Sequence, residues 1–198
     1  MVHSKGRSAH QLKRALIFVA SIATLTAASS ALAGDKDRPG DWFGFDEVRS
    51  GALAHQIEDS PGEEGVDLNL ELLFDKLPGG YGSRIVEYFL TPRPHIGASI
   101  NLNGDTSQLY FGMTWDIHLT DRLFVETSFG GAFHDGPHNE DGESKFGCTL
   151  NFRESASIGY RLSAQWNVML TIDHMSNAGL CDENRGLTNA GVRVGYRW

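Results

Sequence analysis

Alternation of apolar and polar residues is the feature that most constrains the fold of this chain. Side chains of a β-strand point alternately to two faces, so strict alternation predicts a strand with one apolar and one polar face. In residues 66–74, VDLNLELLF, the apolar side chains share one face and Asp, Asn and Glu share the other. A weaker pattern over residues 48–57 raises the number of predicted strands to eight. The other six cover residues 95–103, 109–119, 123–134, 148–162, 166–176 and 188–198.

The lengths of these strands and the positions of the aromatic residues indicate which face points outward. A soluble sandwich or lipocalin-like barrel would bury the apolar faces, whereas a transmembrane barrel turns them to lipid and encloses the polar ones. A tilted strand needs about 9–11 residues to cross a bilayer, which matches the predicted lengths. Aromatic residues also lie at the ends of the apolar faces, as interfacial girdles do: Tyr160, Trp166, Tyr196 and Trp198. We therefore predict an all-β fold, an eight-stranded antiparallel up-and-down transmembrane β-barrel.

The N-terminal residues 1–33 do not fit the barrel pattern. Four basic residues precede the apolar stretch 15–33, which ends in Ala-Leu-Ala. These are the features of a secretory signal peptide, so we expect cleavage before Gly34 and a mature barrel of residues 34–198. An uncleaved membrane anchor is the alternative, which the Ser-, Thr- and Ala-rich second half of the stretch disfavours.

The predicted mature chain is strongly acidic. The full chain has a formal net charge of −8, and removal of the four basic residues of the signal peptide lowers it to −12. Phosphate contacts require a basic surface, so we expect no nucleic-acid partner.

The connections between the predicted strands should alternate between longer outward loops and short periplasmic turns. One connection, residues 76–92, is too long for a periplasmic turn and should contain a strand extension or a short helix. The expected outward loops are 58–65, 103–106, 134–147 and 177–187, and the expected turns are 119–122 and 162–166.

His174 and Ser176 stand two residues apart near the end of the predicted strand 166–176. Residues at this spacing point to the same face, here the lipid-facing side shared with Ile172. A polar pair on such a surface is unfavourable unless it has partners or a purpose. The pair is therefore either a girdle histidine with a turn serine, or part of a hydrolase site.

The hydrolase interpretation assigns each residue a chemical role. A serine hydroxyl becomes a nucleophile when a neighbouring imidazole takes its proton, which makes Ser176 the nucleophile and His174 the general base. Asn177 could then direct its amide, and Gly179 its backbone N–H, to the developing oxyanion.

The same residues carry a family resemblance. The stretch His174-Met175-Ser176-Asn177-Ala178-Gly179 and the final strand GVRVGYRW resemble the outer-membrane lipid A 3-O-deacylases of the PagL type. The resemblance implies a Ser–His–acid triad on the outside of an eight-stranded barrel, with an asparagine in the oxyanion hole. It also implies release of the 3-O-linked acyl chain of lipid A, the membrane anchor of lipopolysaccharide.

The triad acid is the position where the chain departs from this family. The family's glutamate falls at Thr188, which could still hold the imidazole tautomer by a hydrogen bond. A hairpin turn centred on Ala164 would place Glu154 opposite His174, as a substitute acid or as a contact for the substrate hydroxyl. An interfacial girdle carboxylate is the alternative for Glu154, and Glu183 is a further candidate acid.

Two cysteines, Cys148 and Cys181, lie on the outer side of the predicted barrel. Because the chain is predicted to be exported, we expect a disulfide between them that pins the loop after Ser176; two unrelated thiols are the alternative. The histidines lack the spacing of metal ligands, and His134 and His138 lie in an acidic loop that is either solvated or binds divalent cations weakly.

We thus predict an esterase of the bacterial outer membrane that acts on lipid A as a monomer and needs neither a metal nor a cofactor. The alternatives are a non-catalytic small barrel with a structural or adhesive role, which the threonine at 188 keeps open, and an outer-membrane phospholipase.

Overall fold

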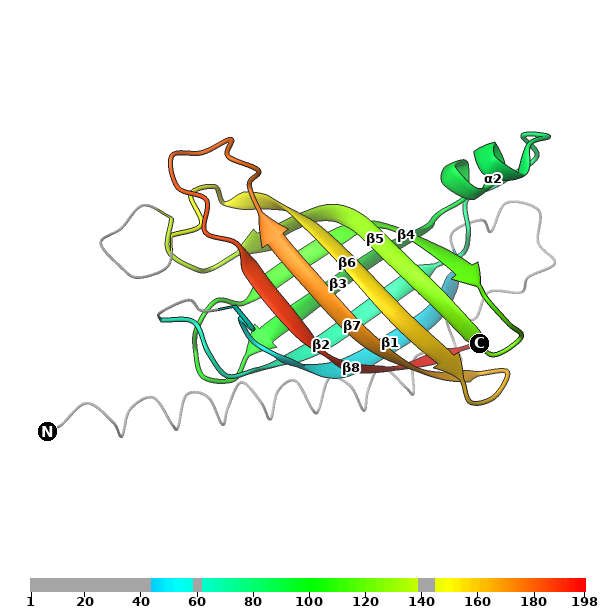
Figure 1. Ribbon diagram of the computed structural model, residues 1–198, viewed down its shortest axis with the longest axis horizontal. Helices are drawn as coiled ribbons and strands as arrows, with labels where there is room; N and C mark the ends of the chain where they lie inside the picture. The colour runs from blue at the N-terminus through cyan, green and yellow to red at the C-terminus, as the bar shows by residue number, and fades with distance from the viewer. Residues whose placement is uncertain (1–43, 59–61, 139–144) are drawn as a thin grey trace, which may run out of the picture.

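Eight antiparallel strands close into one barrel in the computed structural model, which describes residues 44–58, 62–138 and 145–198 (Figure 1). Each strand pairs with the next along the chain and β8 pairs back to β1, so closure satisfies the backbone groups that lipid would leave unpaired. The predicted barrel is confirmed. The strands are β1 (Phe45–Ala54), β2 (Val66–Phe74), β3 (Arg93–Asn101), β4 (Gln108–His118), β5 (Leu123–His134), β6 (Leu150–Arg161), β7 (Trp166–Ser176) and β8 (Leu187–Arg197).

The bounds of the strands agree with the predicted ones where the alternation is clear. β2, β5 and β7 have the predicted bounds. β1 was expected over residues 48–57, but it begins at Phe45 and ends at Ala54. Gln56 has a φ of 46°, in the left-handed region, so the chain leaves the strand before this residue. The predicted signal peptide, residues 1–33, lies outside the described residues.

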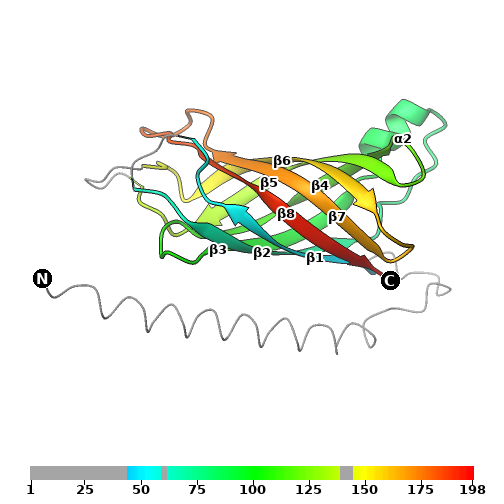
Figure 2. The same cartoon turned by 60° about the horizontal axis from the view of Figure 1, so that its bottom comes forward.

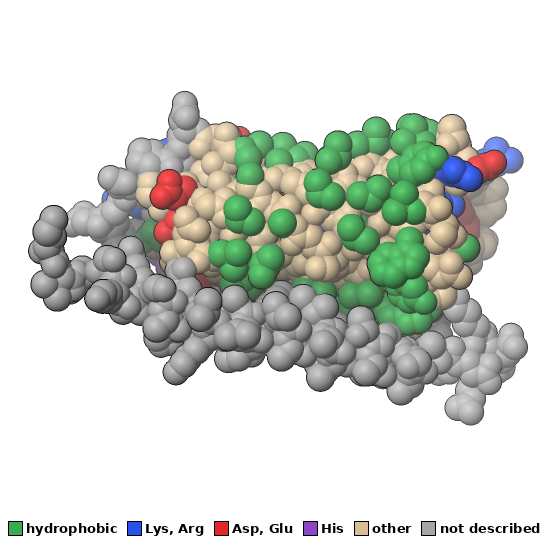
Figure 3. Space-filling view, turned by 90° about the horizontal axis from the view of Figure 1, so that it is seen from below, with side chains coloured by type: hydrophobic (Ala, Val, Ile, Leu, Met, Phe, Trp, Pro, Cys, Tyr) green, Lys and Arg blue, Asp and Glu red, His purple; other side chains and the backbone are tan. Residues whose placement is uncertain are grey.

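The interior of the barrel is polar and its outer surface is apolar. The guanidinium of Arg49, 1% exposed, hydrogen-bonds to the carboxylates of Glu47, Glu71 and Glu126 inside the barrel. Large apolar side chains are exposed instead, and Figure 3 shows them spread over the middle of the surface with charged side chains near the two ends. This arrangement is that of a transmembrane barrel, because a soluble one would bury its apolar face.

The two ends of the barrel differ. One end carries the C-terminus and the short helix α2 (Arg84–Leu90), as Figures 1 and 2 show. This helix lies within the connection 76–92 and decides between the two expected alternatives in favour of a helix. The opposite end, called the outer end below, carries the loops β1–β2, β3–β4, β5–β6 and β7–β8. No helix in the described part of the chain is long and apolar enough to cross a bilayer.

A small apolar cluster closes the interior at the outer end. Its members are fully buried: Tyr110, Ala132, Phe146, Met175 and Leu187. Met175 of β7 pairs in register with Leu187 of β8, and the next pair along is His174 with Thr188. Since neighbouring residues of a strand point to opposite faces, the buried pair fixes the outward direction of His174 and Thr188.

Candidate active site

His174 and Ser176 lie at the outer end of β7, on the outer face of the barrel. Both side chains are half-buried, and Met175 between them points inward with 0% exposure. The predicted direction of the pair is thus observed. Among the described residues, Ser176 Oγ has no hydrogen-bond partner, and no hydrogen bond joins it to His174. In unliganded hydrolases such bonds are often long and form only with substrate.

The imidazole of His174 is held by Thr188 on the neighbouring strand. Nδ1 of His174 lies 2.8 Å from Oγ1 of Thr188, within hydrogen-bond distance. The same threonine hydroxyl donates a hydrogen bond of 3.0 Å to Oε1 of Glu58 in the β1–β2 loop. Nδ1 is therefore engaged, and Nε2 is the ring nitrogen that remains for the serine.

Glu154 stands opposite His174 on β6, in the register predicted from the tight β6–β7 turn. The turn is closed by a hydrogen bond from Leu162 N to Trp166 O, 2.9 Å long. The side chain of Glu154 is exposed on the outer face. Because Thr188 occupies Nδ1 of His174, Glu154 is not the partner of that nitrogen in this structure.

The amide of Asn177 organises the loop that follows β7. Its Nδ2 donates to the carbonyls of Phe146, at 2.8 Å, and Glu183, at 2.6 Å. Its Oδ1 accepts a hydrogen bond of 2.9 Å from the backbone N–H of Gly179. Both expected oxyanion donors are therefore bound to protein acceptors here, and each must leave its acceptor before it can bind an oxyanion.

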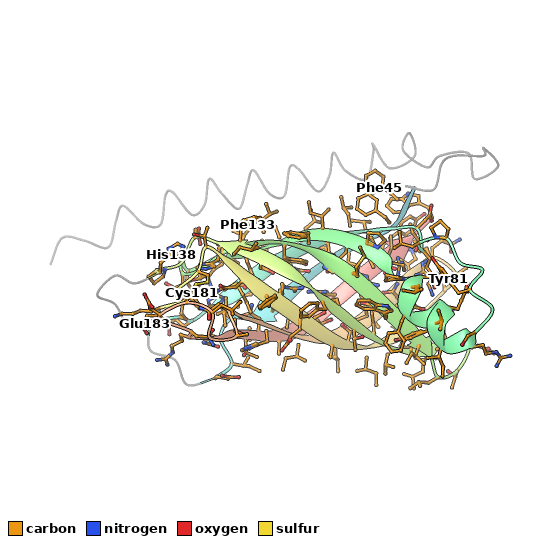
Figure 4. The ribbon with its side chains drawn as sticks, turned by 90° about the horizontal axis from the view of Figure 1, so that it is seen from above. Phe45, Tyr81, Phe133, His138, Cys181 and Glu183 are labelled. Atoms are coloured by element: carbon orange, nitrogen blue, oxygen red, sulfur yellow. A yellow bond between two sulfur atoms is a disulfide. The ribbon has the colours of Figure 1, made fainter. Side chains whose placement is uncertain are left out.

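The disulfide between Cys148 and Cys181 joins the β5–β6 and β7–β8 loops, with their Cα atoms 5.8 Å apart. Figure 4 shows Cys181 beside Glu183 at the outer end. The carboxylate of Glu183 pairs with Lys145 at 3.7 Å, so it is directed to the loop and not to His174. The predicted disulfide is present, and it fixes the loop that begins at Asn177.

An apolar hollow on the outer surface begins next to this site, on the side toward the middle of the barrel. It runs over β5 to β8 and is lined by Ala156, Ile158, Leu170, Ile172, Ala190 and Val192, among others. Ile172 pairs in register with Ala156 on one side and with Ala190 on the other. These three residues lie one outward position nearer the middle of the barrel than Glu154, His174 and Thr188. The small alanine side chains leave the surface hollowed there.

The sequence comparison with protein families decides which family the chain represents. The family model described as lipid A 3-O-deacylase (PagL) matches residues 80–197, which is more than half of the chain. The chain belongs to the PagL family. The matched range contains the His174–Ser176 pair and Thr188, and it excludes β1, β2 and Glu58. No curated protein matches the chain in sequence.

Solved structures agree with the PagL assignment at the level of the fold. The crystal structure of the outer membrane enzyme PagL has a TM-score of 0.58 and 19% sequence identity, covering 77% of this chain and 99% of that chain. A de novo designed transmembrane β-barrel has a TM-score of 0.50 and 13% identity, covering 82% of this chain and 98% of that chain. This PagL-family chain is an outer-membrane β-barrel.

The β1–β2 loop of this PagL-family chain is anchored by a buried charge cluster. Nε2 of His55 hydrogen-bonds to Glu63 at 2.8 Å, and Nδ1 lies 2.8 Å from Asp67. Burial lowers the pKa of His55, but the hydrogen bonds and charges of the two carboxylates outweigh it and raise this pKa to about 9. Burial raises the pKa of Glu63, but its hydrogen bonds with His55 and Thr106 and the charge of His55 lower this pKa below its ordinary value.

In the described part of the PagL-family chain, no group of three or more His, Cys, Asp or Glu side chains is arranged so that it could hold a metal ion. His134 stacks on His138, and its Nε2 hydrogen-bonds to the carbonyl of Cys148 at 2.6 Å. The remainder of the acidic loop, residues 139–144, lies outside the described residues.

Proposed function

We propose that this protein is a serine esterase that removes the 3-O-linked acyl chain of lipid A at the outer surface of the barrel. The observation that supports it most is the hydrogen bond from His174 to Thr188 on the lipid-facing side. This hydrogen bond orients the imidazole on the same outer face as Ser176, where an acyl ester of the outer leaflet would lie. Membership of the lipid A 3-O-deacylase family supports the same substrate.

The reaction follows the chemistry of acyl transfer. Nε2 of His174 accepts the proton of Ser176, whose oxygen attacks the ester carbonyl and forms a tetrahedral oxyanion. The C–O bond to the sugar then breaks, the imidazolium protonates the leaving alkoxide, and the acyl chain stays on the serine. Water, activated by the same imidazole, hydrolyses this acyl-enzyme and releases the fatty acid. No cofactor takes part in these steps.

The oxyanion would be stabilised by Asn177 and Gly179. In the resting arrangement the amide of Asn177 is bound to two loop carbonyls. We propose that substrate binding frees the Nδ2 hydrogen that is bound to Glu183, because this acceptor belongs to the exposed part of the loop. The exchange replaces a neutral carbonyl acceptor by a charged oxyanion, which is the stronger hydrogen-bond acceptor.

The apolar hollow below His174 would hold the acyl chain. Its exposed surface is mostly apolar, with Ala156, Ile172 and Ala190 nearest the catalytic pair, although polar residues such as Thr127 also line it. An acyl chain in the hollow would lie parallel to the surrounding lipid tails with its ester next to Ser176. We propose that Glu154, which pairs with His174 in register, contacts the hydroxyl of the substrate's acyl chain.

The experiment that tests this function uses purified, refolded protein with two substrates. Wild-type protein, Ser176→Ala and Ser83→Ala are incubated separately with lipid A and with a glycerophospholipid, and the released fatty acids are measured. Ser83 lies at the start of α2 on the other end of the barrel and serves as the matched control. Release from lipid A by wild type and Ser83→Ala alone is expected.

Two other outcomes would contradict the proposal. Release from the glycerophospholipid in preference to lipid A would make the protein a phospholipase. Equal release by folded Ser176→Ala and wild type would exclude Ser176 as the nucleophile.

A further inference from the structure

We propose that Glu58, in the β1–β2 loop, is a positioning residue that supplies the negative charge of the active site through the hydroxyl of Thr188. This inference rests on the proposed function, because it completes the Ser176–His174 pair. Thr188 itself carries no charge. The carboxylate of Glu58, which is two hydrogen bonds away from the imidazole, would take over the electrostatic role of a triad acid.

The direction of the two hydrogen bonds follows from the groups that make them. The Glu58 carboxylate can only accept, so the hydroxyl of Thr188 must donate its single hydrogen to Oε1 at 3.0 Å. Oγ1 of Thr188 is then an acceptor toward His174, and the imidazole must carry its hydrogen on Nδ1. That tautomer leaves the lone pair of Nε2 for the proton of Ser176, which a general base needs.

The segment before Glu58 is built to hold it at this place. The side-chain amide of Gln56 donates to the carbonyl of Gly186 and accepts from the N–H of Thr188, both at 3.0 Å. The N–H of Ile57 donates to the carbonyl of Thr188 at 2.8 Å. The chain thus continues its contact with β8 beyond the end of β1, and Glu58 is the next residue.

The contact with β8 holds the backbone of Gln56 in an unfavourable conformation. Its φ of 46° is uncommon for a residue other than glycine, and its side chain is nearly fully buried. Residues held in such conformations by their surroundings cluster at functional sites. Here the turn directs the chain back over Thr188, which is 5% exposed because this segment covers it.

The surroundings of His174 leave Glu58 as the carboxylate connected to its Nδ1. Glu154 faces the ring from β6 but makes no hydrogen bond to it among the described residues. The carboxylate of Glu183 is directed to Lys145. Glu58 is itself exposed to solvent, which screens its charge, so its contribution should be smaller than that of a buried triad acid.

Steady-state kinetics of four variants on lipid A test this relay, the hydrogen-bonded chain from Glu58 through Thr188 to His174. Glu58→Gln keeps the shape and removes the charge, so kcat should fall about tenfold with KM nearly unchanged, because the imidazolium forms only in the transition state. Thr188→Val should cause at least the same loss, and adding Glu58→Gln to it should cause no further loss. Glu64→Gln, in the same loop, is the matched control and should behave as wild type.

A rescue experiment separates charge from structure. Thr188→Glu in the Glu58→Gln background places a carboxylate next to His174 and should restore most of kcat. Wild-type kcat in folded Glu58→Gln would overturn the relay. An equal additional loss from Glu58→Gln in the Thr188→Val background would also overturn it, since Glu58 would then act independently of Thr188.

The relay can also be tested without turnover. The ¹⁵N NMR shifts of the His174 ring in the folded wild type should be those of the Nδ1–H tautomer, and Thr188→Val should give a mixture. An Nε2–H tautomer in the wild type would contradict the relay. Wild-type protein that releases no more acyl chain than Ser176→Ala would instead contradict the proposed function, and the NMR result would still decide the hydrogen-bond chain.

Discussion

The ring of His174 packs directly against Gly186, the residue before β8. A Cβ added at Gly186 would overlap with Cε1 of the imidazole and lie 3.0 Å from Nε2. The ring therefore occupies space that any other residue at 186 would fill. The carbonyl of Gly186 also accepts a hydrogen bond from the side chain of Gln56. The same residue therefore makes room for the His174 ring and anchors the β1–β2 loop.

Replacement of this glycine should affect the reaction and leave the barrel intact. In Gly186→Ala the imidazole must move away from its hydrogen bond with Thr188, and misplacement of a catalytic group by about 1 Å can lower the rate about 100-fold. Fatty acid release from lipid A should fall to this extent, while the heat-dependent gel mobility of the folded barrel stays unchanged. Wild-type activity in this variant would show that the observed ring position is not the catalytic one.

The hollow next to the site should determine which acyl chains are accepted. Ala156→Phe would fill it directly below Glu154, so release of long acyl chains should fall about tenfold relative to short ones. Ala98→Phe places the same side chain on the outer face of β3, on another part of the barrel, and is the control. An unchanged chain-length profile in Ala156→Phe would place the acyl chain elsewhere.

Loss of the disulfide should lower the order of the β7–β8 loop more than the stability of the barrel. Cys148→Ser with Cys181→Ser releases the loop that begins at Asn177, although Asn177 retains its bonds to the two carbonyls. We expect kcat to fall about tenfold, because the released loop holds Asn177 and Gly179 less precisely near Ser176, and misplacement by about 1 Å can cost about 100-fold. Limited proteolysis of the β7–β8 loop should become faster. A fall in barrel stability without a change in kcat would contradict this division.

The β1–β2 loop should loosen at high pH. The pKa of His55 is raised to about 9 from its ordinary value near 6.5, so its stabilising contribution is complete below about pH 6.5 and is lost as pH rises through 9. Cleavage of the loop by a protease that is active across this range should therefore accelerate between pH 7 and pH 10. In His55→Gln the rate of cleavage should be high at both pH values. A pH-independent rate in the wild type would exclude the charged form of His55.

The fold was predictable because local alternation locates the strands, and the strand lengths and aromatic girdles distinguish a transmembrane barrel from a soluble sheet. β5 and β7 were located to the residue, since each has a long amphipathic pattern bounded by turn residues. The alternation in β1 is weak, with small residues such as Gly51 and Ala52 on it, and its end was misplaced. Nothing in the local sequence around Gln56 indicates its left-handed backbone, because the side-chain contacts that hold it come from β8.

The candidate site was predictable only where it lies on paired strands. Strand parity and the turn at Ala164 were sufficient to place Glu154 opposite His174. The family resemblance indicated Thr188, and parity gave its outward direction; the structure pairs it with His174. Glu58 carries no such signal, because its contact depends on the pairing of the first strand with the last. The engagement of Asn177 by the carbonyls of Phe146 and Glu183 likewise depends on how three loops pack together.

The mass of lipid A in an outer membrane that contains the protein tests the central proposal most directly. Wild-type protein should yield lipid A that lacks one 3-O-linked acyl chain. Membranes with an equal amount of folded Ser176→Ala should yield the intact molecule. Identical lipid A from the two membranes would contradict the assignment of Ser176 and His174 as the catalytic pair of a lipid A esterase.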